Sequence, residues 1–379
     1  MKKVLVIVLI VLIIILNINT YAKQEEKRGV FISYIELDNY IKSKTIEESK
    51  NNIKKMISNL ESFKLNTIIL QVRQEQDAIY KSKIFPYSKH VTLENNKTFD
   101  VLKYFIKIAH QKNIKVVAWI NPYRVKTNND INSIPKDSPA YKYINTNTLW
   151  IENGIYLNPS KKEVEDLVLK GVEEVLNYNI DGLLFDDYFY PSSEIDNEDY
   201  NEYLKNNAYI DKNTYHLNII NRLINKTHKL CKRKKIPFGI SPDGNIENNY
   251  QKHYADVKTW LKEKDYVDFI IPQIYYGFYN STKSYINVLN EWEKLIKNKD
   301  ISLYVALAFY KVGQVDNYAK EGRDEWILNN DIIMREIILS RNADHYKGFI
   351  LFRYDNIFNK EKYTTNSIEE IENLKKIIK

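Results

Sequence analysis

Short β-rich runs alternate with amphipathic helical stretches along almost the whole chain, and this alternation limits the possible folds more than any other feature. Eight runs are apolar or small through their middles, as expected of parallel strands that are covered on both faces. They are Gly29–Tyr34, Thr67–Val72, Lys115–Ile120, Gly182–Asp186, Phe238–Ser241, Phe269–Ile274, Leu303–Ala308 and Gly348–Arg353. Eight β–α units predict an α/β fold, a (β/α)8 TIM barrel over residues 23–379 that ends in a helix over Ile368–Ile378.

The helices between these strands have recognisable starts. Three of them begin with pairs at capping-box spacing: Thr45 with Glu48, Ser160 with Glu163, and Ser367 with Glu370. A doubly wound open sheet is the alternative fold, but it would need a glycine-rich turn after the first strand. Ser33-Tyr34-Ile35-Glu36 is not such a turn. The barrel is therefore favoured.

Connections are long on one side of the expected barrel only. Those after the second, third and fourth strands are long and polar: Gln74–Lys97, Val125–Asn158 and Pro191–Asn213. Connections on the opposite side are as short as Leu65-Asn66 and Asn113-Ile114. Barrel enzymes build their sites from the loops that follow the strands. The asymmetry therefore predicts a functional site on that face.

Polar and aromatic side chains gather where the strands end. They include Arg73, Asp77, Trp119, Asn121, Tyr123, Arg124, Asn158, Tyr188, Tyr190, Ser241, Gln273, Tyr275, Tyr276, Tyr310 and Arg353. Any single one could be a solvated strand end, but together they supply amides, arginines and rings for sugar recognition, beside carboxylates for acid–base chemistry. We expect six rings to line a sugar-stacking groove: Trp119, Tyr123, Tyr188, Tyr190, Tyr275 and Tyr276.

Several of these segments together resemble the bacterial glycosyl-hydrolase-like family 10. The matching segments are Arg28-Gly29-Val30-Phe31, Gln71-Val72-Arg73 with Asp77-Ala78-Ile79-Tyr80, Trp119-Ile120-Asn121-Pro122-Tyr123-Arg124, Leu157-Asn158-Pro159, Phe185-Asp186-Asp187-Tyr188-Phe189-Tyr190-Pro191, Ile240-Ser241-Pro242 and Pro272-Gln273-Ile274-Tyr275. The resemblance implies a barrel related to glycoside hydrolases, in a family whose members are often secreted or lipoproteins and of which at least some act on the glycan strands of peptidoglycan. The chain departs from the family pattern by lacking a lipobox cysteine and by having Gln74-Glu75-Gln76 where a proline and a glycine are expected.

Glycoside hydrolysis normally uses two carboxyl groups. Asp186 and Asp187 are adjacent, and successive strand residues face opposite sides, so only one of them is expected to face the site. The family resemblance favours Asp186 as the catalytic carboxylate, with Asp187 held by Arg124 or Arg73. The structural alternative is that the pair caps a loop.

The partner of Asp186 is open. Asp243 and Glu75 rank close together, ahead of Asp77 and Asp355. Two functions follow: an extracytoplasmic glycosidase that acts on cell-wall or related polysaccharide, or a sugar-binding barrel without hydrolysis.

Other classes of function have little support in the composition. The net charge of +7 comes from 56 basic and 49 acidic residues. Because the two are nearly balanced, the composition does not indicate a basic nucleic-acid-binding surface. Cys231 is the only cysteine, which excludes an intramolecular disulfide and a CxxC motif. The six histidines never fall at HxxxH or HxH spacing. We therefore expect neither a metal site nor a cofactor.

The N-terminus has the pattern of an export segment. Lys2 and Lys3 precede an unbroken apolar run over Val4–Leu16, and Tyr21-Ala22 offers a mediocre cleavage site. Residues 1–22 are thus expected to be a cleaved signal peptide or an N-terminal membrane anchor, and either would place the barrel outside the cytoplasm.

Overall fold

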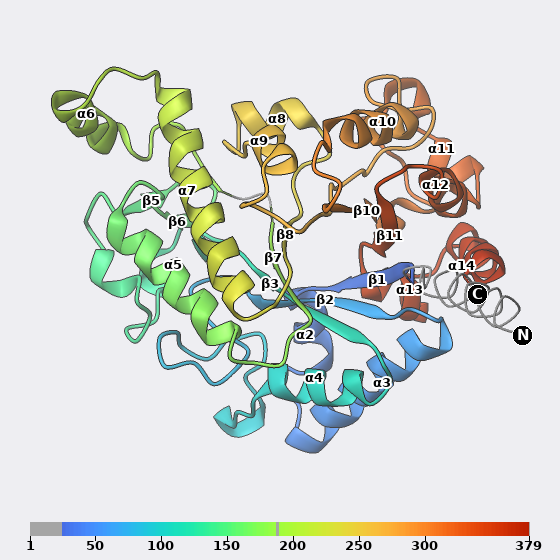
Figure 1. The fold of residues 1–379 in the computed structure, drawn as a ribbon. Helices are drawn as coiled ribbons and strands as arrows, with labels where there is room; N and C mark the ends of the chain where they lie inside the picture. Colours follow the sequence, from blue (N-terminus) through green and yellow to red (C-terminus); the bar gives the residue numbers. More distant parts are fainter. Residues whose placement is uncertain (1–24, 187–188, 379) are drawn as a thin grey trace, which may run out of the picture.

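The computed structural model describes residues 25–186 and 189–378, and its centre is a closed barrel of eight parallel strands (Figure 1). The barrel strands are β1 (Lys27–Ile32), β2 (Thr67–Arg73), β3 (Lys115–Ile120), β7 (Gly182–Phe185), β8 (Phe238–Ile240), β9 (Phe269–Ile270), β10 (Ser302–Leu307) and β11 (Tyr346–Leu351). They follow one another around the barrel in chain order, and β11 pairs with β1. The (β/α)8 fold and all eight strands are confirmed.

Alternate strand residues fill the barrel interior. The inner cluster comprises Phe31, Ile69, Val117, Trp119, Leu184, Phe269, Ile271, Tyr304, Ala306 and Ile350, all of which are buried. Side chains alternate along a strand, so Leu184 faces inward and Asp186, two residues later, continues that face at the end of β7. In the register, Trp119 pairs with Gln71 on one side and with Leu184 on the other. The ends of β2, β3 and β7 therefore meet at one place.

Helices cover the outside of the barrel in Figure 1. The main ones are α3 (Ile46–Ser62), α4 (Val101–His110), α5 (Lys162–Val175), α7 (Lys212–Arg233), α9 (Val257–Lys262), α10 (Tyr285–Leu295), α12 (Ile332–Ser340) and α14 (Thr365–Ile377). Shorter helices lie in the connections: α2 (Tyr34–Tyr40), α6 (Asn197–Asn206), α8 (Ile246–Gln251), α11 (Glu325–Leu328) and α13 (Tyr354–Phe358).

One of the three expected helix starts is confirmed, and two are wrong. Thr45 and Glu48 form the reciprocal capping box of α3. The N-cap of α5 is Lys161, without a side-chain bond, because the Ser160 hydroxyl donates to Asn158 instead. Helix α14 begins three residues before the expected start, at Thr365, because Thr364 forms its capping box with Ser367.

The long connection after β3 contains a small sheet that the strand pattern did not indicate. Its strands are β4 (Arg124–Lys126), β5 (Leu149–Ile151) and β6 (Ile155–Leu157), paired antiparallel in the order β4-β6-β5. Arg124 pairs with Tyr156 across this sheet. Strand β9 is shorter than expected because Pro272 has no N–H group to continue the ladder.

The expected export segment, residues 1–22, lies outside the described residues. In the part of the chain that the structure describes, no helix combines the length and apolarity that crossing a membrane requires. Cys231 is free and fully buried on α7.

Candidate active site

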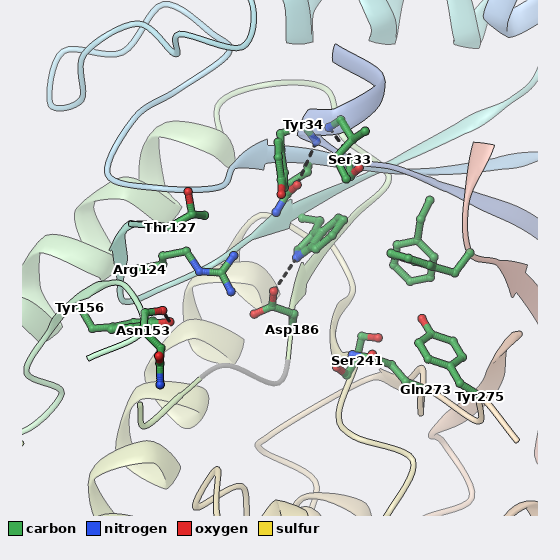
Figure 2. Close-up of a pocket in the computed structure, with 15 residues that line it drawn as sticks. Ser33, Tyr34, Arg124, Thr127, Asn153, Tyr156, Asp186, Ser241, Gln273 and Tyr275 are labelled. Atoms are coloured by element: carbon green, nitrogen blue, oxygen red, sulfur yellow. Dashed lines mark hydrogen bonds between the residues drawn. The ribbon is translucent and has the colours of Figure 1, made fainter. Parts of the chain in front are cut away.

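A cavity of about 490 Å³ opens at the end of the barrel where the strands terminate (Figure 2). This volume lies within the range of ~300–1,000 Å³ that is typical of small-ligand pockets. The lining residues are Phe31, Ser33, Tyr34, Ile35, Gln71, Trp119, Arg124, Thr127, Asn153, Tyr156, Asp186, Ser241, Gln273, Tyr275 and Phe352. We call it the central cavity. Asp186 is the only carboxylate among the described residues that line it.

Two neighbouring side chains hold the Asp186 carboxylate. Its Oδ2 atom accepts hydrogen bonds from Asn121 Nδ2 and, at 3.2 Å, from Trp119 Nε1. Both donors come from β3 and the turn after it, the neighbour of β7 in the barrel. Asp186 is 4% exposed, so it is buried but open to the cavity. Donors to a carboxylate favour its ionised form.

A chain of amides fixes Asn121 in turn. The backbone N–H of Tyr34 donates to Gln71 Oε1 at 3.1 Å, and Gln71 Nε2 donates to Asn121 Oδ1 at 2.6 Å. This orients the Asn121 amide so that its N–H group faces Asp186. Gln71 and Asn121 are both buried. The ends of four strands are thus joined by hydrogen bonds behind one carboxylate.

Changing Asn121 to alanine should therefore lower kcat with a smaller effect on KM, because Asp186 loses the donor that orients it. Misplacement of a catalytic group by about 1 Å can cost about 10²-fold in rate. Steady-state kinetics on a glycan substrate measures this split, and circular dichroism checks the fold. A change in KM alone would contradict the positioning role of Asn121.

Aromatic rings line one side of the central cavity. Trp119 packs edge-on against Phe31 at 5.6 Å, and Phe31 contacts Phe352 at 5.5 Å. Tyr275 contacts Phe352 at 5.7 Å and Tyr310 at 5.9 Å. Rings that are fixed in this way offer preformed apolar surfaces with polar edges, which suit the faces and hydroxyls of sugars.

Polar residues lie on the other side of Asp186. Figure 2 shows Arg124, Thr127, Asn153 and Tyr156 on the side of the carboxylate opposite Gln273 and Tyr275. Arg124 and Tyr156 come from the small sheet β4-β6-β5, and Asn153 lies between β5 and β6. The connection after β3 thus forms one wall of the cavity.

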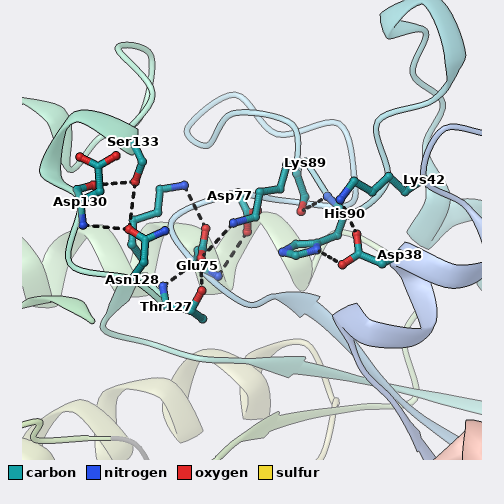
Figure 3. A network of polar contacts seen from close by, with 12 residues as sticks. Asp38, Lys42, Glu75, Asp77, Lys89, His90, Thr127, Asn128, Asp130 and Ser133 are labelled. Carbon is teal, nitrogen blue, oxygen red and sulfur yellow. Dashed lines mark hydrogen bonds and ion pairs between the residues drawn. The ribbon is translucent and has the colours of Figure 1, made fainter. Parts of the chain in front are cut away.

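Glu75 supports this wall instead of lining it (Figure 3). Its carboxylate pairs with Lys126 at 3.0 Å and with Lys89 at 3.5 Å, and it accepts from the backbone N–H of Thr127 at 3.1 Å. Burial raises the pKa of Glu75, but the two lysines and the hydrogen bonds outweigh burial, so its pKa lies below the usual value. A carboxylate of this kind stays ionised and is a poor proton donor.

Asp243, Asp77 and Asp355 also lie outside the cavity lining. Burial raises the pKa of Asp243, but hydrogen bonds from His253, the Asn245 N–H and Asn248 lower it below the usual value. Asp77 is buried in the network of Figure 3, and burial raises its pKa. Asp355, on α13, is fully buried and accepts from Asn39 and Lys362.

The sequence-based site residues separate into several groups. The central cavity brings together Trp119, Arg124, Asp186, Ser241, Gln273 and Tyr275. Just behind its lining lie Asn121, bonded to Asp186; Tyr310, against Tyr275; and Arg353, paired with Glu36 at 2.5 Å. Asp187 and Tyr188 lie outside the described residues.

The remaining expected residues do not line the central cavity, and their surroundings explain why. Arg73 is fully buried with its guanidinium 3.7 Å from the centre of the Phe85 ring, and Tyr123 is 1% exposed. The Asn158 amide holds the connection after β7 by donating to Ile195 O and Asp199. Tyr276 packs beside Gly244, and Tyr190 belongs to a second cavity.

Nine lining residues were not among the expected site residues: Phe31, Ser33, Tyr34, Ile35, Gln71, Thr127, Asn153, Tyr156 and Phe352. Those from the connection after β3 carry no local signal, because three-residue strands are too short for a readable alternation. Ser33 and Phe352 each follow a barrel strand by one residue, so their position in the chain was a usable signal.

No group of three or more histidine, cysteine, aspartate or glutamate side chains that could hold a metal ion occurs within residues 25–186 and 189–378. The lining of the central cavity offers one carboxylate, Asp186, among hydrogen-bond donors and aromatic rings.

Comparison with known proteins places the chain in a family. The family model described as glycosyl hydrolase-like 10 matches residues 26–324. The chain belongs to this family. Glycosyl hydrolase YngK of Bacillus subtilis is 30% identical over 340 residues, which is 82% of this chain and 64% of that protein. Glycosyl hydrolase DigH of Escherichia coli K12 is 32% identical over 333 residues, 79% of this chain and 74% of that protein.

The fold of the glycosyl hydrolase-like 10 chain also occurs among solved structures. The glycoside hydrolase domain of PgaB (BpsB) from Bordetella bronchiseptica has a TM-score of 0.58 at 13% identity, over 93% of this chain and 99% of that one. At such low identity the likeness concerns the fold alone. The chain spans less than two thirds of the length of YngK.

Proposed function

We propose that the protein is an exported glycoside hydrolase that cleaves the glycan strands of a peptidoglycan-type cell wall or a related polysaccharide. The observation that carries this proposal is the position of Asp186, held by two N–H donors in a cavity lined by aromatic rings on one side and by polar groups on the other. Membership of the glycosyl hydrolase-like 10 family supports it, as do relatives named glycosyl hydrolase.

In this proposal Asp186 acts as the ionised carboxylate, because its hydrogen-bond donors favour the charged form. Either it attacks the anomeric carbon, or it takes a proton from a water molecule that attacks there; in both cases the glycosidic C–O bond breaks, and the leaving oxygen is protonated by a partner acid or by water. Trp119 and Tyr275 hold the sugar rings, and Arg124 and Gln273 bind hydroxyl groups. Because the pKa values of Glu75 and Asp243 lie below the usual range, neither is suited to be the acid without a change of surroundings on substrate binding.

The test is the release of new reducing ends from purified, peptide-free wall glycan by the full-length protein. Hydrolysis supports the proposal. A non-catalytic sugar-binding barrel is the second candidate, because Asp186 is the only carboxylate among the described residues that line the cavity. Tight glycan binding with no product from any wall glycan would favour that candidate and contradict hydrolysis.

Tyr275 should contribute to glycan binding by stacking. It is half-buried at the cavity, so changing it to alanine removes an accessible ring and should weaken glycan affinity about ten-fold. Isothermal titration calorimetry measures this effect, and thermal unfolding shows whether the ring serves core packing instead. The matched control is Tyr318, a tyrosine that is 88% exposed; its change to alanine should leave affinity unchanged.

The proposed location outside the cytoplasm rests on Lys2, Lys3 and the apolar run Val4–Leu16. Fractionation of native cells should find the protein in the envelope or the medium. Full-length protein that is soluble in the cytoplasm would contradict export without affecting the catalytic proposal.

A further inference from the structure

A second cavity of about 440 Å³ adjoins the central one. It is lined by Glu152, Asn153, Tyr156, Tyr190, Pro191, Ser192, Ser193, Gln251, Lys252, His253 and Tyr254. Asn153 and Tyr156 line both cavities, so the two share a wall. We call this second space the side cavity. Its lining comes from the connections after β3, β7 and β8.

We propose that the side cavity binds the continuation of the glycan chain beyond the sugars in the central cavity. This inference rests on the proposed function and specifies its substrate as an extended oligosaccharide. An extended polymer cleaved at Asp186 must continue beyond the central cavity, and the side cavity borders the central one at Asn153 and Tyr156. Tyr156 stands at this junction, next to Arg124 across the small sheet.

The inner wall of the side cavity is held rigidly. Tyr190 stacks on His216 with the ring centres 4.4 Å apart, and Tyr254 packs edge-on against His216 at 4.3 Å. Asp196 fixes both partners: it accepts from the Tyr190 hydroxyl at 3.0 Å and contacts His216 Nε2 at 2.8 Å. A preformed wall of this kind reduces the entropy lost on binding.

The outer wall supplies the polar groups that sugars need. Ser192, Ser193, Gln251 and Lys252 together offer hydroxyl, amide and ammonium groups, which can donate to hydroxyl or carbonyl oxygens of a sugar. Gln251 and Lys252 are exposed at the end of α8. Buried aromatic rings on the inner wall and exposed polar groups on the outer wall are a combination that suits a carbohydrate and not an apolar ligand.

The dependence of the cleavage rate on the length of the substrate tests the side-cavity proposal. The probe is a ladder of peptide-free wall-glycan oligosaccharides from two to eight sugars, and the measured quantity is kcat/KM for each length. The wild type should cleave eight-sugar chains about ten-fold or more faster than four-sugar chains, because further hydrogen bonds of about 1.4 kcal/mol in total correspond to ten-fold. The double variant Gln251→Ala/Lys252→Ala should reduce this ratio to about two or less.

A matched control variant tests whether the loss of exposed glutamine and lysine side chains matters only at the side cavity. Gln111→Ala/Lys229→Ala removes one exposed glutamine and one exposed lysine near the C-terminal ends of α4 and α7, at the opposite end of the barrel, and should preserve the ratio. Equal length ratios in wild type and in the Gln251/Lys252 variant would overturn the side-cavity proposal while hydrolysis stands.

Absence of any cleavage by the wild type would instead overturn the proposed function. The side cavity is then judged from calorimetric affinities for the same oligosaccharides. An affinity gain with length that the Gln251/Lys252 variant loses supports the side-cavity proposal. An equal gain in both proteins, or no gain in either, overturns it.

Discussion

Changing Asp186 to asparagine should lower kcat on wall glycan by about 10²–10⁴-fold or more, the size of effect expected for loss of an acid–base or nucleophilic group. The amide occupies the same space as the carboxylate, so the barrel and the cavity should persist. Reducing-end assays measure the rate, and calorimetry should show that glycan still binds. A variant with near wild-type activity would remove Asp186 from the reaction.

Three further carboxylate variants are compared with Asp186→Asn, one as a control and two as tests of the partner carboxyl. Asp166→Asn changes an exposed carboxylate on α5 and should have no effect on the rate. Glu75→Gln and Asp243→Asn test the two candidates for the partner carboxyl. Whichever of these lowers kcat as strongly as Asp186→Asn, while glycan binding and thermal stability are kept, is the second catalytic group. If neither does, Glu75 retains the role of supporting Thr127 and the cavity wall.

The stability of the protein should fall as the pH rises from about 4.5 to about 8, and Glu370 should account for a large part of the fall. Burial raises the pKa of Glu370 to about 8, although the N–H groups at the start of α12 partly offset it. The folded state therefore retains a proton that the unfolded chain releases near pH 4.5, and the contribution is fully present only below that pH. A shift of this size corresponds to at most about 5 kcal/mol.

Glu370→Gln should flatten this dependence, since glutamine keeps an oxygen acceptor for the Met334 N–H but has no charge to lose. Denaturant unfolding from pH 5 to 8 should show the variant gaining stability relative to the wild type as the pH rises. Burial first and then the charge of Glu370 raise the pKa of Glu336 as well. Glu372→Gln, an exposed control on α14, should leave the profile unchanged. Parallel profiles for wild type and Glu370→Gln would contradict this origin of the pH dependence.

The barrel could be predicted from sequence because each strand is buried on both faces and reads as a short apolar run. Strand boundaries were less certain, since Pro272 ends β9 early although apolar residues continue after it. Helix starts depend on which hydroxyl reaches the backbone, and Ser160 and Thr364 show that spacing alone does not decide this. The small sheet after β3 could not be predicted because its pairing joins strands of three residues each.

The site was predictable where a residue follows a barrel strand closely on its inward face. Asp186 follows from the alternation that also places Leu184 in the barrel interior. The ion pair that keeps Glu75 out of the cavity lining could not be predicted from the sequence, because its partner Lys126 lies 51 positions away in the chain. Tyr123 and Arg73 have sugar-binding chemistry, but burial against other parts of the protein removes both from the cavity.

The most direct test of the central claim is a crystal structure of the Asp186→Asn variant with a bound wall-glycan oligosaccharide. We predict a glycosidic bond with its anomeric carbon or the water beside it about 3–3.5 Å from the side chain at position 186, and sugar rings against Trp119 and Tyr275. The partner carboxyl should then lie across the bond, at ~5–5.5 Å for retention or ~6.5–9.5 Å for inversion. An oligosaccharide that binds with no glycosidic bond near position 186 would contradict the assignment of this cavity as the catalytic centre.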